Sequence, residues 1–181
     1  MVFMERISVR LNDLESIEDL FLLTRSKMEK EGNDSWSHGY PVKEDFKEDI
    51  LEGDSYFYKQ NGVILAYIHA SFDPLEDFFS SSHSEAKLAQ LRQDTGMKDN
   101  EDFLILHRLM IAPAFQGKGL AAEIFHDQAC LYPGRMMMFA VYPNNLKARK
   151  AYERYGFQNA GIYPAFEYGE ETCYLYFKRF A

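Results

Sequence analysis

The chain has 181 residues, a formal net charge of −8 at pH 7 and an isoelectric point near 5.1. Hydrophobic residues make up 46% of it, enough for a substantial core, and its length is that of one domain over residues 1–181. It has neither a dense Lys/Arg run nor an apolar run of the roughly 18 residues that a transmembrane helix needs. We therefore expect no nucleic-acid partner and no membrane span.

The N-terminal segment lacks the basic start and apolar centre of a signal peptide, so we expect a cytoplasmic protein. Cys130 and Cys173 are the only cysteines, and their predicted places on a helix and a strand favour core thiols over a disulfide. An acidic surface slightly favours a cationic partner such as an amine.

The first part of the chain predicts a strand, two helices and a hairpin. Apolar residues alternate along the first segment, as in a strand, and then recur at helical spacing. We expect the second helix to place Phe46, Ile50 and Leu51 inward. Asn61-Gly62 lies between two apolar runs, and both residues tolerate positive φ, so this pair predicts a tight hairpin turn. The predicted ranges are a strand over 4–11, a helix over 14–32, a helix over 41–51, and strands over 55–60 and 63–72.

Residues 73–100 are the least regular part and predict an insertion that carries one helix over 84–93. Loops of this length are usually functional or mobile. The five histidines of the chain show no paired ligand spacing such as His-x-x-x-His, so we expect no metal site. No Gly-x-Ser-x-Gly is present, so a serine nucleophile is not expected either.

The most informative stretch runs from Phe103 to Tyr132. It starts with an apolar run to Ile111, which is long enough for a buried strand and is stopped by Pro113. A glycine-rich segment follows, and then apolar residues recur at helical spacing. The amides in the first turn of a helix have no intrahelical partner, and the helix dipole favours an anion there. Strand, glycine-rich turn and helix together therefore predict a phosphate-binding segment.

Two familiar phosphate-binding motifs do not fit this segment. A Walker A loop has Ser or Thr after its Gly-Lys pair, whereas Gly119 follows Lys118. The letters Gly117-x-Gly119-x-x-Ala122 agree with a dinucleotide fingerprint. That fingerprint, however, comes directly off its strand and is followed about 20 residues later by an acid, and neither condition holds.

A third motif fits, and a second one downstream supports it. Gln116-x-x-Gly119-x-Ala121 resembles the pyrophosphate loop of the GNAT superfamily of N-acetyltransferases. The other signature of that superfamily is Asn-x-x-Ala, a Tyr four residues later, and Gly-Phe at the helix end. Its five places are filled by Asn145, Ala148, Tyr152, Gly156 and Phe157. The chain is therefore identified as similar to GNAT acetyltransferases, closely from Phe103 onward and by element order before it.

The resemblance implies the GNAT acyl-CoA N-acyltransferase fold, of the α/β class (α+β by some schemes). We expect a central mixed, largely antiparallel sheet of about seven strands, flanked by about four helices. The insertion over 73–100 would then overhang the acceptor site. The remaining predicted elements are a strand over 136–141, a helix over 144–155 and strands over 157–166 and 172–180.

The resemblance also implies that acetyl-CoA is the cofactor and coenzyme A the product. The backbone of Leu109, Met110 and Ile111 would pair with the pantetheine arm as an added strand does. Asn145 would hydrogen-bond the pantetheine or its neighbourhood, and Tyr152 would contact the sulfur. The loop residues that would hold the pyrophosphate are Gln116, Gly117, Lys118, Gly119, Leu120 and Ala121.

Direct attack of an amine on the thioester needs a base and an acid. His107 on the central strand is the candidate base, since an unperturbed imidazole suits neutral pH. Some relatives use a glutamate two residues earlier, where this chain has Ile105. A structural histidine remains the alternative, and Glu101 and Asp102 are weaker base candidates. Tyr152 is the candidate acid for the leaving thiolate.

The acceptor is less well defined by the sequence. We expect a small-molecule primary amine, with a peptide or protein amine and a catalytically silent acyl-CoA-binding regulatory module as alternatives. Trp36, Tyr40, Phe78 and Tyr163 are candidates for lining its pocket. Either a monomer or a homodimer agrees with the resemblance.

Overall fold

The structure is a computed structural model that describes residues 4–72, 84–98, 101–164 and 172–180. These residues fall into two compact units. The N-terminal unit contains 4–71 and 106–127, and the C-terminal unit contains 72, 84–98, 101–105, 128–164 and 172–180. The strand of residues 103–111 runs from one unit into the other, so each unit is described by itself.

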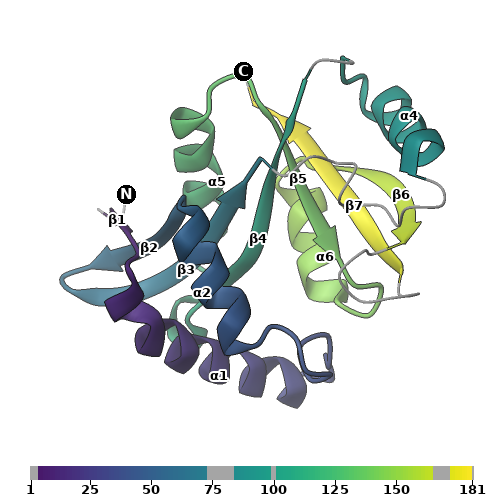
Figure 1. Cartoon of the computed structure of the whole chain (residues 1–181). Coiled ribbons are helices and arrows are strands. Elements are labelled where there is room, and N and C mark those ends of the chain that lie inside the picture. Colours follow the sequence, from purple (N-terminus) through teal and green to yellow (C-terminus); the bar gives the residue numbers. More distant parts are fainter. Residues whose placement is uncertain (1–3, 73–83, 99–100, 165–171, 181) are drawn as a thin grey trace. The chain divides into compact units, whose positions relative to one another are not determined.

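Seven strands form one sheet in the order β1-β2-β3-β4-β5-β7-β6 (Figure 1). β4 and β5 pair in parallel, whereas β1-β2, β2-β3, β5-β7 and β6-β7 pair antiparallel, which confirms the mixed, largely antiparallel sheet. The strands are β1 (Glu5–Ser8), β2 (Ser55–Gln60), β3 (Val63–Ser71), β4 (Phe103–Ile111), β5 (Met136–Val141), β6 (Gln158–Pro164) and β7 (Thr172–Arg179).

The described residues contain five α-helices, one more than the approximate number that the resemblance implies. The additional helix is α4, in the predicted insertion. The helices are α1 (Leu14–Lys30), α2 (Lys43–Glu52), α4 (Ser84–Thr95), α5 (Leu120–Leu131) and α6 (Leu146–Arg154), with short 3-10 turns η1 (Leu11–Asp13) and η2 (Pro113–Phe115). Within the described ranges, no helix is long and apolar enough to cross a membrane.

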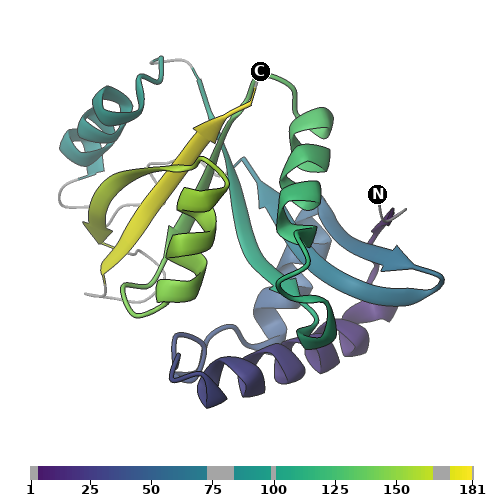
Figure 2. The ribbon, with the colours of Figure 1, turned by 180° about the vertical axis from the view of Figure 1, so that it is seen from behind.

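The core of the N-terminal unit joins α1 and α2 to β2, β3 and β4. In Figure 1 both helices lie on one face of β2 and β3, and Figure 2 shows α5 on the other face. Asp127 ties α5 to the strands, because it accepts hydrogen bonds from Arg6 Nη1 at 2.7 Å and Tyr58 OH at 2.8 Å. The buried core residues are Val9, Ile17, Leu20, Phe21, Phe46, Phe57, Tyr67 and Met110.

The hairpin turn is as predicted, with φ of 50° at Asn61 and 79° at Gly62. The inward face of α2 is only partly as predicted. Phe46 is buried, but Leu51 is 64% exposed, and the position one helical turn after Phe46 that turns inward is Asp49, 3% exposed. The expectation for Leu51 was wrong because helical spacing from Phe46 reaches Asp49 and Ile50 instead.

A second core fills the C-terminal unit between α4 and the strands β4 to β7. It consists of Leu88, Leu91, Met97, Phe103, Ile105, Met136, Met138, Tyr163, Cys173, Leu175 and Phe177. Cys173 is therefore a core thiol as expected, whereas Cys130 is exposed on α5, which corrects the prediction for that residue.

Candidate functional site

The glycine-rich segment after β4 forms an open turn that leads into α5. Gln116 holds the start of this turn, because its Nε2 donates a 2.9 Å hydrogen bond to the carbonyl oxygen of Ile111. Gly117 and Gly119 have φ of 76° and 85°, which side chains with a Cβ rarely adopt. A Cβ built on either glycine meets no atom within 4 Å, so a ligand has room to approach this backbone.

The residues from Gly117 to Gly119 are exposed, and the helix begins at Leu120, which is buried. The buried Leu120 therefore anchors the start of α5, while the residues just before it are exposed to solvent. Lys118 lies with its Nζ 5.2 Å from the ring centroid of Phe115, on the same turn. The predicted pyrophosphate segment therefore has a helix start, two glycines and a positive charge together in the N-terminal unit.

β4 carries the candidate base beside an unusual backbone position. His107 Nε2 lies 3.0 Å from Ser71 Oγ on β3. Burial, with a smaller effect from Arg108, lowers the pKa of His107 to about 3. Its imidazole is therefore neutral at pH 7. Arg108 follows with φ of 50°, a left-handed conformation that is rare in a strand and for a residue with a side chain.

The Arg108 guanidinium is buried in an ion pair with Asp49 of α2. Its Nη1 lies 2.5 Å from Asp49 Oδ1, and the two side chains are 8% and 5% exposed. The other oxygen, Asp49 Oδ2, accepts a 3.0 Å hydrogen bond from Tyr67 OH. Burial raises the pKa of Asp49 to about 7, although Arg108 and the Tyr67 hydroxyl act in the opposite direction. Arg108 also lies over the Tyr40 ring, 5.1 Å from its centroid.

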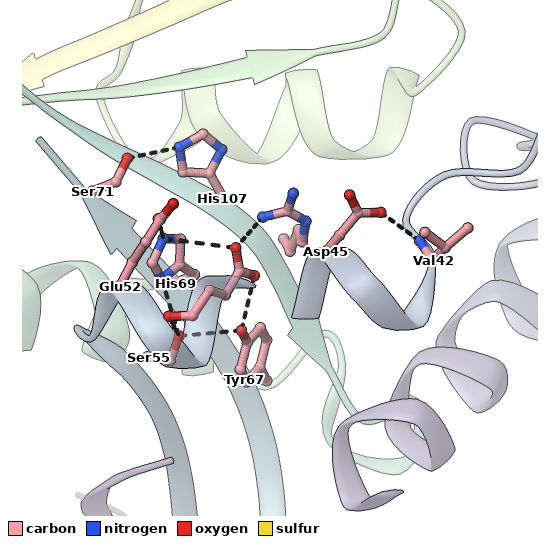
Figure 3. A network of polar contacts seen from close by, with 10 residues as sticks. Val42, Asp45, Glu52, Ser55, Tyr67, His69, Ser71 and His107 are labelled. Atoms are coloured by element: carbon pink, nitrogen blue, oxygen red, sulfur yellow. Dashed lines mark hydrogen bonds and ion pairs between the residues drawn. The ribbon is translucent and has the colours of Figure 1, made fainter. Parts of the chain in front are cut away.

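His69 of β3 joins this pair to a carboxylate at the surface. Its Nε2 lies 3.2 Å from Glu52 Oε2 and 3.7 Å from Asp49 Oδ1, and its Nδ1 lies 3.0 Å from Ser55 Oγ. The His69 side chain is 2% exposed and that of Glu52 58%. Figure 3 shows Glu52, Ser55, Tyr67 and His69 converging in the N-terminal unit, with His107 and Ser71 above them.

The sequence analysis missed Asp49, Glu52 and His69. Asp49 lies on the apolar face of α2, and His69 is in the middle of an apolar strand, so each breaks an apolar pattern by a single polar residue. A single polar residue within an apolar pattern was the sequence signal from which these two buried polar side chains could have been predicted. The three side chains come from α2 and β3, and no sequence spacing relates them.

These three residues also have the spacing of a possible set of cation ligands, since one ligand atom from each lies within 4.8 Å of the others. In the structure, Asp49 is already paired with the Arg108 cation and His69 is hydrogen-bonded to Glu52 and Ser55. Protein groups thus compensate the buried charges. The expectation of no metal site stays a prediction.

In the C-terminal unit, α6 follows the second motif residue by residue. Asn145 caps the helix, because its Oδ1 accepts a 3.2 Å hydrogen bond from Ala148 N. Gly156 ends it with φ of 82°, and Phe157 is buried. Tyr152 stacks on Phe139 with ring centroids 4.4 Å apart and 18° between the planes. Burial raises the pKa of the Tyr152 hydroxyl, which therefore keeps its proton at neutral pH.

The candidate pocket residues that the structure describes are divided between the two units. Trp36 lies 5.8 Å from Phe21 and packs against the core of the N-terminal unit, where Tyr40 contacts Arg108. Tyr163 belongs to the C-terminal unit, is 6% exposed and donates a 2.9 Å hydrogen bond to Asp94 of α4. Phe78 lies outside the described residues.

Comparison with known proteins identifies the family. The sequence model of the Acetyltransferase (GNAT) family matches residues 17–157, most of the chain, so the protein belongs to the GNAT acetyltransferase family. A comparison with curated proteins gives no match.

Several solved structures share the fold. A GNAT-family acetyltransferase from Streptococcus agalactiae 2603 is 21% identical with a TM-score of 0.77, covering 98% of this chain and 96% of that one. The ribosomal-protein-S18-alanine N-acetyltransferase of Escherichia coli is 16% identical with a TM-score of 0.60, covering 98% and 94%. Arabidopsis thaliana Naa50, in complex with the bisubstrate analogue CoA-Ac-MVNAL, is 14% identical with a TM-score of 0.59, covering 98% and 99%.

Proposed function

We propose that this protein is an acetyl-CoA-dependent N-acetyltransferase that transfers the acetyl group to a primary amine of a small molecule. The observation that carries the proposal is the open turn Gln116–Ala121, which joins β4 to α5 with two left-handed glycines. Membership of the GNAT acetyltransferase family supports acetyl-CoA as the donor. The acceptor class rests on the resemblance in sequence.

Each cofactor contact has a proposed residue. The amides of Gln116 to Ala121 hold the pyrophosphate, and Lys118 adds positive charge to that segment. The backbone of Leu109 to Ile111 pairs with the pantetheine arm; these residues follow Phe103–Ile105, the part of β4 that pairs with β5. Asn145 contributes near the pantetheine, although its side-chain oxygen caps α6.

The proposed reaction is direct attack in a ternary complex. The amine nitrogen forms a bond to the thioester carbon, the carbon–sulfur bond breaks, and coenzyme A leaves. An alkylammonium with a pKa of about 10.4 must lose a proton first, which costs about 4–5 kcal/mol at pH 7. Tyr152 is protonated at neutral pH because burial raises its pKa, and it gives its phenolic proton to the departing thiolate. The raised pKa opposes this transfer, so the role depends on the hydroxyl lying at the sulfur. His107 as the base stays a prediction.

A peptide or protein amine is the second candidate acceptor. Two proteins of the same fold support it: one is described as an alanine N-acetyltransferase for ribosomal protein S18, and Naa50 is in complex with a bisubstrate analogue. A catalytically silent acyl-CoA-binding module is the alternative outside the enzymes, because Ile105 stands where some relatives have a glutamate.

Calorimetric titration with acetyl-CoA, followed by a thiol-release screen over small amines and short peptides, tests the proposal. We expect micromolar binding and thiol release with at least one small amine. Release with peptides alone would move the acceptor to the second class. Binding without release on any acceptor would support the silent module, and no binding would contradict the assignment of Gln116–Ala121.

A further inference from the structure

The N-terminal unit contains a cluster of charged groups to which the proposed reaction gives no role. Asp49, His69 and Arg108 are 2–8% exposed at their side chains, whereas Glu52 is 58% exposed. Burying charges is costly unless they are paired. Here Asp49 and Arg108 are paired with each other, and His69 links them to the exposed carboxylate of Glu52.

His107 is poorly suited to receive the acceptor's proton in these surroundings. Its pKa is lowered to about 3, and an alkylammonium has a pKa of about 10.4. A glutamate carboxylate, with an ordinary pKa of about 4.3, holds a proton more firmly than an imidazole with this lowered pKa. His107 is therefore the weaker candidate for this step.

Glu52 is the exposed carboxylate in the same unit, and the cluster orients it. His69 Nε2 lies 3.2 Å from Glu52 Oε2, while its Nδ1 is held 3.0 Å from Ser55 Oγ. A histidine whose Nδ1 is held by a hydroxyl presents its other ring nitrogen to the Glu52 carboxylate, and this contact restricts the position of that carboxylate. The His69 and His107 rings are 5.7 Å apart between centroids, which places Glu52's partner beside the candidate catalytic strand β4.

The charges around Glu52 leave it able to attract a cation. Asp49 is compensated by Arg108 and by the hydroxyl of Tyr67. The charged and titratable groups of the cluster come from α2, β3 and β4; they are Asp49, Glu52, Tyr67, His69, His107 and Arg108. Glu52 is the member of this set whose carboxylate reaches solvent.

We propose that Glu52 binds the ammonium group of the acceptor and takes up its proton, with His69 as the residue that positions Glu52. The proton moves from the ammonium nitrogen to the Glu52 carboxylate, directly or through water, and then to solvent. The freed lone pair forms the nitrogen–carbon bond, and the carbon–sulfur bond breaks. The nitrogen then loses its second proton to solvent, and the thiolate of coenzyme A leaves with the proton from Tyr152. This inference rests on the proposed acetyltransferase function.

Glu52→Gln tests it, and Glu48→Gln is the matched control, one turn earlier on α2, also exposed and with the same change of charge. With an alkylamine at pH 7, we expect Glu52→Gln to lower kcat/KM by about 100-fold, a typical contribution of a general base. The deficit should shrink as the pH rises toward the pKa of the amine. Glu48→Gln should stay within about twofold of the wild type, since exposed charges away from a site have small effects.

A weakly basic aromatic amine, already neutral at pH 7, provides an internal comparison and should lose little activity in Glu52→Gln. His69→Asn should show a smaller loss with the same pH trend, and a melting temperature recorded beside it reports any loss of folding. Equal rates for Glu52→Gln and Glu48→Gln at every pH would overturn the proposal. A loss of the same size at every pH and with both amines would do so as well.

The experiments distinguish a failure of the Glu52 proposal from a failure of the proposed acetyltransferase function. Glu52→Gln should bind acetyl-CoA in calorimetry as the wild type does, because Glu52 is assigned to the acceptor. If the wild type releases no thiol with any amine, the acetyltransferase proposal fails and this inference fails with it. If His107→Ala changes the pH profile while Glu52→Gln does not, the acetyltransferase stands and the base is His107.

Discussion

Replacing Arg108 by methionine tests how much the buried ion pair contributes to folding of the N-terminal unit. Arg108 and Asp49 are 8% and 5% exposed at their side chains, with 2.5 Å between Nη1 and Oδ1. Removing one partner of such a pair leaves an uncompensated buried charge and costs about 3–5 kcal/mol. For a chain of this length we expect the melting temperature to fall by about 6–20 °C.

The cost should depend on pH in a defined direction. Burial raises the pKa of Asp49 to about 7, and loss of the guanidinium would raise this pKa further. A carboxyl with a raised pKa in the folded state is neutral below that pKa, so it then needs no cation. Arg108→Met should therefore destabilise less at pH 5 than at pH 8.

Urea unfolding of four proteins measures the effect: the wild type, Arg108→Met, Asp49→Leu and the double variant. We expect the double variant to be more stable than the sum of the single losses predicts, because no buried charge remains. Arg25→Met is the control, since Arg25 pairs with Glu29 at the surface and should cost less than about 1 kcal/mol. Strictly additive losses in the double variant would refute the reasoning.

Three further substitutions test other parts of the site. Tyr152→Phe keeps the stacking on Phe139 but removes the phenolic proton. We expect the rate of thiol release to fall about 100-fold, while the affinity for acetyl-CoA measured by calorimetry stays unchanged. Full activity of this variant would exclude an acid role for Tyr152. Gly119→Ala strains a left-handed residue by about 1 kcal/mol or more and should weaken acetyl-CoA binding about tenfold. Gly62→Ala, with a similar φ in the hairpin turn, should cost similar stability in urea without changing that affinity. His107→Gln removes a group whose folded-state pKa is lowered to about 3. Between pH 6.5 and 4 the unfolded wild type binds a proton that the folded wild type does not, so the wild type should lose up to about 3 kcal/mol more stability than the variant. Equal losses of stability in the two proteins would count against a buried, neutral His107.

The helices, strands and turns could be predicted from the sequence because patterns within a few residues determine them. Asn61-Gly62 fixes a hairpin through two positive φ angles, and the five-residue motif of α6 combines a cap, a small residue, a tyrosine and a glycine stop. Each of these signals lies within a few residues of the chain. The sheet type then followed from the resemblance, and the observed parallel and antiparallel pairings agree with it.

The charged cluster was not predictable in the same way, because its members are related only through the fold. We did not predict that Asp49 is buried, because we expected Leu51 to face inward on α2. We did not single out His69, because it lies within an otherwise apolar strand. Periodicity reports which face of an element is buried, but it does not report which buried polar groups meet across elements. The same limit applies to Ser71 and His107, which lie on β3 and β4.

The composition of the cluster argues for a role in function. Well-packed apolar side chains in place of a buried ion pair are often neutral or stabilising, so folding alone gives little reason to retain Asp49 and Arg108 at the core. Arg108 also keeps a left-handed backbone conformation that costs about 1–3 kcal/mol. The surrounding contacts hold this strained residue next to His107, and they lead through His69 to the exposed carboxylate of Glu52. Under the proposal for Glu52 the cluster has a role, because the contacts that join Arg108 to Asp49 continue to His69, the residue proposed to position the carboxylate.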